Sequence, residues 1–310
     1  MSSPFSTLSL LSWKREPEVF ANSLGANLTE SGFCGITDHS IDQDLIKDVL
    51  VKFKMFFELP LETKMKYFQS NLGGARGYTP IKVETPKGGY EADLKEFWHV
   101  GRELTKSHPF REWMPPNVWV KEIQDFELKL TKLFAQFDSL GKKLLSAIAI
   151  FLKLEKNFFN LKINNGNSVM RAIHYPKIIK EEKGERAGAH EDINLITLLI
   201  GGSNPGLEIQ NQQGEWTNTT VDENTILVNV GDMLQRYTNH ILVSTTHRVI
   251  ATKDQKKSSR YSIPFFVHPN PDWFIETLPS CISKNNPNKY PIGILSEDFL
   301  RERLKDIKLL

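Results

Sequence analysis

The pattern of apolar residues changes near residue 167, and this change constrains the fold more than any other feature. Beyond it, the apolar runs are short, rich in Val, Ile and Thr, and separated by turn-forming clusters such as 201–205 and 253–259. Val, Ile and Thr favour strands, and Gly, Pro, Asn and Ser favour the turns between them. Many short strands at this spacing indicate a sandwich or barrel, of which the jelly roll is one form. We predict strands at residues 168–175, 189–200, 206–210, 225–230, 244–251 and 260–267.

Apolar residues before residue 167 recur instead at helical spacing. Phe20, Leu24 and Leu28 are four residues apart after Pro17, and a spacing of three to four residues returns twice further along the chain. We predict helices from residue 17 to a stop at Gly32, over 45–57, over 118–154 and over 296–310, with a buried strand at 33–36 and irregular chain over 70–117.

The predicted elements indicate a fold that is mainly β with flanking helices. A chain of 310 residues is within reach of a single barrel with helical decoration. We expect residues 1–117 to form a helical and irregular region that packs on the core and is not an independent domain. Residues 118–310 would hold the long helix, the strands of the core and the C-terminal helix.

Charge and cysteine content argue against several classes of protein. The 39 basic and 37 acidic residues give a net charge of +2, which offers no electrostatic reason to bind nucleic acid or an anionic membrane. Two cysteines, Cys34 and Cys281, make neither a disulfide framework nor a zinc knuckle, and they fit a reducing compartment. The N-terminus has no signal-peptide pattern, and no apolar run approaches the ~20 residues that span a bilayer. We expect a cytoplasmic monomer that acts on a small molecule.

The most informative polar residues are His190 and Asp192, which are two apart. Alternate side chains of a strand face the same way, so both would point inward while Glu191 points elsewhere. His247 begins a later apolar run and could supply a third ligand. Two histidines and one carboxylate on one face of an octahedral metal leave three adjacent positions open, as iron(II) oxygenases require. A closed tetrahedral zinc site matches this set less well.

The His-x-Asp pattern alone is weak, because it arises by chance in many chains. An exposed turn would be the better interpretation if the apolar run 193–200 did not follow directly. The other histidines are interpreted as surface residues or as neighbours of the ligands, and these are His39, His99, His108, His174, His240 and His268.

A second pair two residues apart, Arg260 and Ser262, predicts an anion site. A guanidinium binds a carboxylate through two parallel hydrogen bonds, and a serine hydroxyl can add a third. Twelve residues with a polar turn separate His247 from Arg260, which suits two neighbouring antiparallel strands and would bring Arg260 near the metal. The hydroxyl of Tyr175 could reach the same anion. A tyrosine that only packs in the barrel is an equally good interpretation.

Several short segments carry a resemblance to a known family. They are 31–39 (SGFCGITDH), 56–60 (FFELP) with Glu62 and Lys64, 74–78 (GARGY), 93–96 (DLKE), 229–232 (NVGD), 244–249 (STTHRV) and 260–262 (RYS). Together they resemble the isopenicillin-N-synthase-like branch of the iron(II)/2-oxoglutarate-dependent dioxygenases, over nearly the whole chain. Asp38 and Ser40 replace the Asn and Gly that are usual in that family.

The resemblance implies a double-stranded β-helix (jelly-roll) core, with iron(II) and 2-oxoglutarate as cofactors. It places iron on His190, Asp192 and His247, and 2-oxoglutarate on Arg260, Ser262 and Tyr175. Two points qualify the second assignment. Many plant members have Asn at the position of Ile173, and the Arg-x-Ser pair binds substrate in relatives, such as isopenicillin N synthase, that do not use 2-oxoglutarate.

In the family, four further positions can border the substrate pocket, and here they hold Arg171, Glu191, Arg76 and Tyr78. An arginine there would suit an anionic group, so a small carboxylated or amino-acid-like metabolite is expected, although structural salt bridges would explain these residues equally well. The resemblance implies hydroxylation by default, with desaturation or ring closure as further outcomes and with release of succinate and CO2. A carboxylate ligand leaves no room for halide. The alternatives are an iron oxidase of the same fold that does not use 2-oxoglutarate, and a non-catalytic binding protein.

Overall fold

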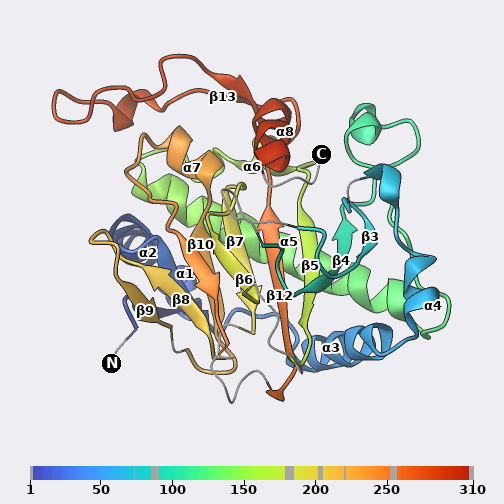
Figure 1. Cartoon of the computed structure of the whole chain (residues 1–310). Helices are drawn as coiled ribbons and strands as arrows, with labels where there is room; N and C mark the ends of the chain where they lie inside the picture. Colours follow the sequence, from blue (N-terminus) through green and yellow to red (C-terminus); the bar gives the residue numbers. More distant parts are fainter. Residues whose placement is uncertain are drawn as a thin grey trace.

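The computed structural model describes residues 3–72, 74–84, 91–178, 185–201, 205–219, 221–251 and 257–306. Its centre is built from two β-sheets whose apolar inner faces meet (Figure 1). The larger sheet has the strand order β1-β2-β10-β7-β12-β5-β4-β3, and the smaller has the order β6-β11-β8-β9. Neither sheet closes into a barrel, and the pair has the layered form expected of a double-stranded β-helix.

The bounds of the strands follow the chain. In the larger sheet they are β1 (Thr7–Ser9), β2 (Phe33–Thr37), β3 (Gly77–Thr79), β4 (Glu96–Gly101), β5 (Val169–Tyr175), β7 (Ile196–Ile200), β10 (Ile226–Val230) and β12 (Arg260–Val267). In the smaller sheet they are β6 (Ala187–His190), β8 (Leu207–Gln210), β9 (Trp216–Asn218) and β11 (His247–Val249), and a separate pair consists of β13 (Phe274–Ile275) and β14 (Ile294–Leu295).

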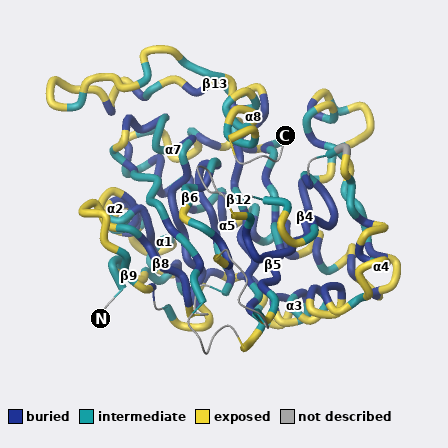
Figure 2. Tube along the Cα trace, viewed as in Figure 1, coloured by how far each residue is buried: buried dark blue, intermediate teal, exposed yellow. Residues whose placement is uncertain are grey.

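The helices are α1 (Leu11–Arg15), α2 (Pro17–Glu30), α3 (Gln43–Phe57), α4 (Leu61–Met65), α5 (Phe126–Phe151), α6 (Asn160–Ile163), α7 (Asp232–Tyr237) and α8 (Ser296–Asp306). Helix α5 packs on the outer face of the larger sheet and α2 packs on its β1–β2 edge, while α7 and α8 contact the β13–β14 pair (Figure 1). Figure 2 shows that the central strands are largely buried, while exposed residues gather on the outer sides of α3 and α4 and in the chain between β13 and β14. The described helices include none whose length and apolar character would suit a membrane span.

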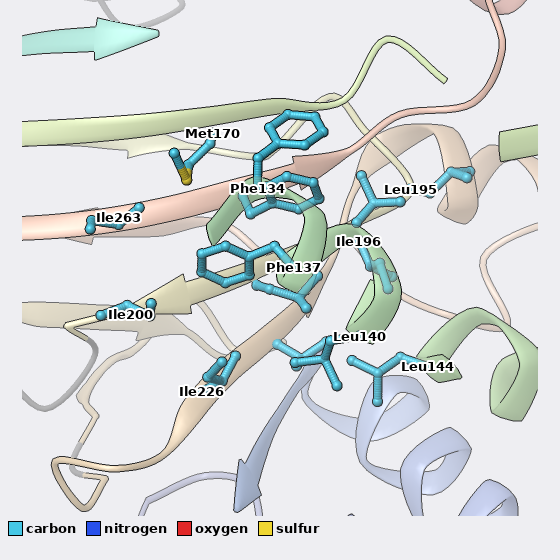
Figure 3. Close-up of a cluster of buried hydrophobic side chains, with 14 of the residues drawn as sticks. Phe134, Phe137, Leu140, Leu144, Met170, Leu195, Ile196, Ile200, Ile226 and Ile263 are labelled. Atoms are coloured by element: carbon cyan, nitrogen blue, oxygen red, sulfur yellow. The ribbon is translucent and has the colours of Figure 1, made fainter. Parts of the chain in front are cut away.

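In strand β12, alternate side chains face opposite sides of the sheet, so one set packs in the core and the other set lines the cavity between the sheets. Phe265 faces α5, where its ring stacks on Phe137 with the centroids 5.1 Å apart. The alternate residues Ser262 and Phe266 face the cavity between the sheets. Gly141 lets α5 approach closely, because a Cβ there would lie 2.9 Å from Val267 Cγ2. Figure 3 shows the apolar side chains of α5 packed against those of the sheet.

Two predictions for the first half of the chain are wrong. The long helix begins at Phe126 and not at residue 118, because Asp125 adopts a left-handed conformation with φ 55° that interrupts the helical backbone. The region 70–117 is not irregular throughout, because β3 and β4 lie within it. Every residue of β4 is buried, including Glu96 and His99, whose polar side chains conceal the strand in the sequence.

The predicted strand 189–200 is two strands in different sheets. β6 ends at His190 and β7 begins at Ile196, and between them the Asn194 side chain donates to Ile196 O over 2.6 Å. The expectation that the strands of His247 and Arg260 are neighbours is also wrong, since β11 pairs with β6 and β8 while β12 pairs with β5 and β7. Strand β9 was not predicted at all. The remaining predicted strands and the helices that begin near residues 17 and 45 are confirmed within a few residues. The predicted helix 296–310 is confirmed over Ser296–Asp306, and its last four residues lie outside the described part of the chain.

Candidate active site

Three potential metal ligands converge at the open end of the smaller sheet. His190 ends β6, His247 begins β11, and the two are direct cross-strand partners with ring centroids 4.4 Å apart. Asp192 lies two residues beyond the end of β6, so the expectation that it shares a strand with His190 is wrong. It reaches the histidines because the chain turns there toward β7. One donor atom from each of the three residues lies within 4.8 Å of the others, close enough to hold one metal ion.

Hydrogen bonds orient the three side chains toward one point. His190 Nδ1 lies 2.7 Å from Gly188 O, and His247 Nδ1 lies 3.1 Å from Thr245 O, which leaves the Nε2 atom of each ring free to bind a metal. Partners of this kind hold the tautomer and the orientation of ligating imidazoles. The backbone carbonyls around the two histidines therefore prepare this donor set before any ion binds.

The carboxylate of Asp192 is held in the same manner. Its Oδ2 accepts hydrogen bonds from Thr197 Oγ1 at 2.5 Å and from Asn229 Nδ2 at 2.8 Å, while Oδ1 lies 4.0 Å from His247 Nε2. Burial raises the pKa of Asp192, but the two imidazoles and the two hydrogen bonds together bring it below its ordinary value. The group is therefore an ionised ligand at neutral pH. Asn229 belongs to the NVGD segment, whose role in the site the sequence reasoning missed.

A small cavity of about 70 Å³ lies between the sheets beside these ligands. Arg260, Ser262 and Tyr175 all line it, although β12 is not a neighbour of β11. Arg260 is 5% exposed, its Nη1 lies 3.3 Å from Ser262 Oγ, and its guanidinium lies 5.1 Å from the centre of the Tyr175 ring. No carboxylate of the described chain forms an ion pair with it. A buried guanidinium without a carboxylate partner is a site for an anionic ligand.

Lys95 lines the same cavity and was not among the predicted site residues. Unlike Arg260 it is already neutralised, because its Nζ lies 2.7 Å from Asp93 and 3.1 Å from Glu84. The DLKE segment was the signal in the sequence that could have identified it.

A larger cavity of about 410 Å³ opens on the other side of His190 and Asp192. Arg171, Arg76 and Glu191 line it, as expected from the resemblance. Arg171 is held by Glu84 over 3.0 Å and by His99 over 2.5 Å. Glu191 accepts a hydrogen bond from Thr246. The structure does not bring Tyr78 to this cavity, because its buried hydroxyl donates to Glu96 over 2.6 Å behind the sheet.

None of the other histidines joins the three ligands. His39, His99, His174 and His268 are buried, so the surface interpretation is wrong for these four. His174 lies 2.7 Å from Glu96, and His99 contacts Arg171 in the wall of the larger cavity. His268 also lines that cavity, and burial lowers its pKa to about 4. The polarity of these rings was visible in the sequence, but their burial was not.

A double-stranded β-helix with two imidazoles and one carboxylate beside a basic cavity defines a non-haem iron(II) oxygenase that uses 2-oxoglutarate and O2. The chain belongs to the 2OG-Fe(II) oxygenase superfamily, whose family model matches residues 166–269. A second model, the non-haem dioxygenase in morphine synthesis N-terminal, matches residues 4–122. Iron(II) and 2-oxoglutarate are therefore its cofactors.

Characterised relatives match most of the chain. A 2-oxoglutarate-Fe(II) type oxidoreductase of Emericella nidulans is 33% identical over 286 residues, covering 89% of this chain and 81% of its own. A proline hydroxylase of Petromyces alliaceus is 32% identical over 303 residues and 93% of both chains. The crystal structure of Neurospora crassa T7H in complex with alpha-KG and thymine has a TM-score of 0.85 at 28% identity, covering 97% of this chain and 96% of its own.

Proposed function

We propose that the protein oxidises an unactivated C–H bond of a small carboxylated or amino-acid-like metabolite, with hydroxylation as the default outcome and release of succinate and CO2. One observation carries this proposal: Arg76, in the wall of the larger cavity, is a buried guanidinium that forms no ion pair with any carboxylate of the described residues. That cavity also contains His190 and Asp192, so an anion held by Arg76 would lie in the same space as the metal ligands.

The surroundings of Arg76 support a role in binding. Its side chain is 1% exposed and packs on Gly101, where a Cβ would lie 2.1 Å from the guanidinium carbon. Nε and Nη1 donate to the backbone oxygens of Pro115 and Ala75, and Nη2 has no hydrogen-bond partner among the described residues. Burial lowers the pKa of Arg76 to about 10, so the group is still charged at neutral pH. A buried charge of this kind is stabilised when an anion pairs with it.

The other two arginines in the described wall of this cavity are already paired. Arg171 binds Glu84 at 3.0 Å, and Arg301 binds Glu297 at 3.0 Å. Arg76 is therefore the better candidate for a substrate carboxylate, and Arg171 is better interpreted as a support for the wall. Glu191 can border the substrate, but its hydrogen bond to Thr246 gives it a structural partner as well.

We further propose that His190, Asp192 and His247 hold the iron, and that Arg260, Ser262 and Tyr175 hold the far carboxylate of 2-oxoglutarate. The two groups of residues line one enclosed cavity, and the only unpaired cation among its described charged residues is Arg260. Iron(II) and 2-oxoglutarate, when bound there, would activate O2, which is the oxidant: one oxygen atom would be used to oxidise 2-oxoglutarate to succinate and CO2, and the other would be available to oxidise the C–H bond. The apolar lining from Phe33, Leu199 and Val249 excludes water from the reacting groups.

The test is turnover by the purified protein with iron(II), 2-oxoglutarate and O2, on a panel of carboxylates and amino acids. L-proline belongs to the panel because a relative that is 32% identical is a proline hydroxylase. We expect succinate to form together with a product that has gained one oxygen atom. Arg76→Met should abolish product, and Arg15→Met, which alters an exposed arginine, should not.

Other outcomes identify the alternatives. Oxidation of a panel member without 2-oxoglutarate would indicate an oxidase of the same fold. Binding of iron and of a panel member without any turnover would indicate a non-catalytic binding protein. Product formation that is unaffected by Arg76→Met would overturn the assignment of Arg76.

A further inference from the structure

Arg76 is not alone among the residues around the larger cavity in having a polar atom that lacks a hydrogen bond within the described chain. Asn167 Oδ1, His268 Nδ1 and Glu297 Oε2 are also buried and have no hydrogen-bond partner in the part of the chain that the structure describes, and all three residues line the cavity. Buried polar atoms in folded proteins are almost always hydrogen-bonded, so several unpaired atoms around one space indicate that a polar molecule belongs there.

These three residues come from different parts of the chain and meet at one place. Asn167 precedes β5, His268 follows β12, and Glu297 lies in the first turn of α8. The backbone of residues 268–271 joins them: Asn167 N donates to Pro269 O at 3.1 Å, and Glu297 N donates to Pro271 O at 3.2 Å. The hydroxyl of Ser296 fixes the start of α8 to the same segment, because it donates to Asn270 O at 2.6 Å. This place is therefore built by tertiary contacts and not by one flexible side chain.

The chemistry of this place differs from that of Arg76. The unpaired atoms of Asn167 and Glu297 are oxygens, which accept hydrogen bonds, whereas Arg76 can only donate them. The second carboxylate oxygen of Glu297 already accepts from Arg301 Nε at 3.0 Å, which leaves Oε2 for another donor. A molecule that pairs with these atoms of the cavity therefore has a hydrogen-bond acceptor for Arg76 and an N–H donor for Asn167 and Glu297.

We propose that Asn167 and Glu297 form a binding site for the amino group of the substrate. The substrate is then an amino acid with a free primary or secondary amine, and not a simple carboxylic acid. This inference rests on the proposed function, since it assumes that Arg76 binds the carboxylate of the same molecule. It assigns α8 a direct part in substrate recognition.

The experiment measures binding to the protein loaded anaerobically with iron(II) and 2-oxoglutarate, by thermal shift and then by isothermal titration. The probes are the twenty L-amino acids, the N-acetyl derivative of each, the matching acids that lack the amino group, and thymine. We expect at least one free amino acid to bind, and both its N-acetyl and its desamino analogue to bind at least about tenfold more weakly, as loss of a charged hydrogen bond predicts.

Variants locate the effect on the protein. Glu297→Gln and Asn167→Leu should each weaken binding of the free amino acid about tenfold, while binding of its desamino analogue changes by less than about threefold. Glu302→Gln, at an exposed position of the same helix, should bind like the wild-type protein. Arg301→Gln removes the ion-pair partner of Glu297. If this variant loses as much affinity for the free amino acid as Glu297→Gln does, the ion pair supports binding, and direct contact between Glu297 and the amine is refuted.

The inference is overturned if the desamino acids or thymine bind as well as every free amino acid, or if no probe binds. The visible charge-transfer band of the iron(II)–2-oxoglutarate chelate separates this failure from failure of the proposed function. A band together with binding of the desamino acids refutes only the amine site, whereas a band without binding of any probe also refutes the carboxylate site at Arg76. If the band is absent, the proposed cofactor residues are wrong.

Discussion

Replacement of Arg260 by Met distinguishes a binding role from a structural one, because the two roles predict different changes in the free energy of unfolding without 2-oxoglutarate. Arg260 is buried, its hydrogen bonds to Ser262 and Gly201 are both 3.3 Å long, and no carboxylate of the described chain pairs with it. Burial lowers its pKa, which reflects the unfavourable desolvation of the charge. Without 2-oxoglutarate, the guanidinium therefore contributes an unpaired buried charge that destabilises the folded protein.

The magnitude follows from the bonds that the anion would make. A guanidinium that holds a carboxylate through two charge-assisted hydrogen bonds at about 1.5–3 kcal/mol each contributes about 3–6 kcal/mol to binding. Its removal should raise the Kd for 2-oxoglutarate by a factor between about a hundred and roughly twenty thousand. The free energy of unfolding without 2-oxoglutarate should fall by less than about 1 kcal/mol, or should rise, because two long hydrogen bonds are exchanged for relief of the buried charge.

The assay is chemical denaturation with and without 2-oxoglutarate, combined with anaerobic titration of the chelate band. Arg102→Met is the contrasting variant, since Arg102 binds Asp138 at 2.5 Å and donates to Gly166 O at 2.9 Å, and its loss leaves Asp138 paired with Lys142 alone. It should lose stability and keep its affinity for 2-oxoglutarate. The reasoning is refuted if Arg260→Met loses more than about 3 kcal/mol of stability without ligand and binds 2-oxoglutarate within about threefold of the wild-type protein.

Three further predictions concern the metal, the buried charges and the packing. His247→Ala should abolish tight iron(II) binding in an anaerobic titration, and unchanged affinity would contradict the proposed ligand set. Glu96→Gln should lower the free energy of unfolding at pH 7 by about 3–5 kcal/mol, because it breaks a buried ion pair with Lys64 that spans 2.7 Å. Burial raises the pKa of Glu96, but hydrogen bonds from His174, Lys64 and Tyr78 bring the pKa below its ordinary value of 4.5. The stability that ionised Glu96 contributes is therefore present above pH 4.5 and is lost as the pH falls through the lower pKa of the folded protein. Denaturation from pH 7 to pH 3 should then show a steeper loss for the wild-type protein than for Glu96→Gln. Gly141→Ala should destabilise the protein by about 1–3 kcal/mol, since its Cβ would lie 2.9 Å from Val267, and an unchanged denaturation midpoint would refute the tight packing.

Local patterns predicted most of the secondary structure correctly, and they named the residues that the structure brings together. Side-chain direction in a strand or helix depends on the backbone of the same segment, so period two and period 3.6 are visible without any knowledge of the fold. In this way β12 could be recognised, with Arg260 and Ser262 on one face. The spacing of His190 and Asp192, with His247 at the start of a later apolar run, predicts the metal ligands, and the resemblance of short segments implies the same three residues.

The same patterns failed where a residue's environment comes from distant parts of the chain. Strand β4 was missed because buried Glu96 and His99 have partners on other elements that no local pattern reveals. The apolar run 189–200 is predicted as one strand, because the spacing of its apolar residues does not show that the chain passes from one sheet to the other near Asn194. Both errors arise because burial and hydrogen bonding of polar groups depend on long-range contacts.

By itself, then, the sequence determined the kinds of element, the donor set at His190, Asp192 and His247, and the cation at Arg260. Only the tertiary structure decided that β11 and β12 face each other from different sheets, and that Asp192 reaches the histidines from a turn. It also decided which cations are already paired. Arg171 and Arg76 look alike in the sequence, but Glu84 neutralises only the first. The physical reason is that a charge is available to a ligand only when the folded chain has buried it without supplying a partner.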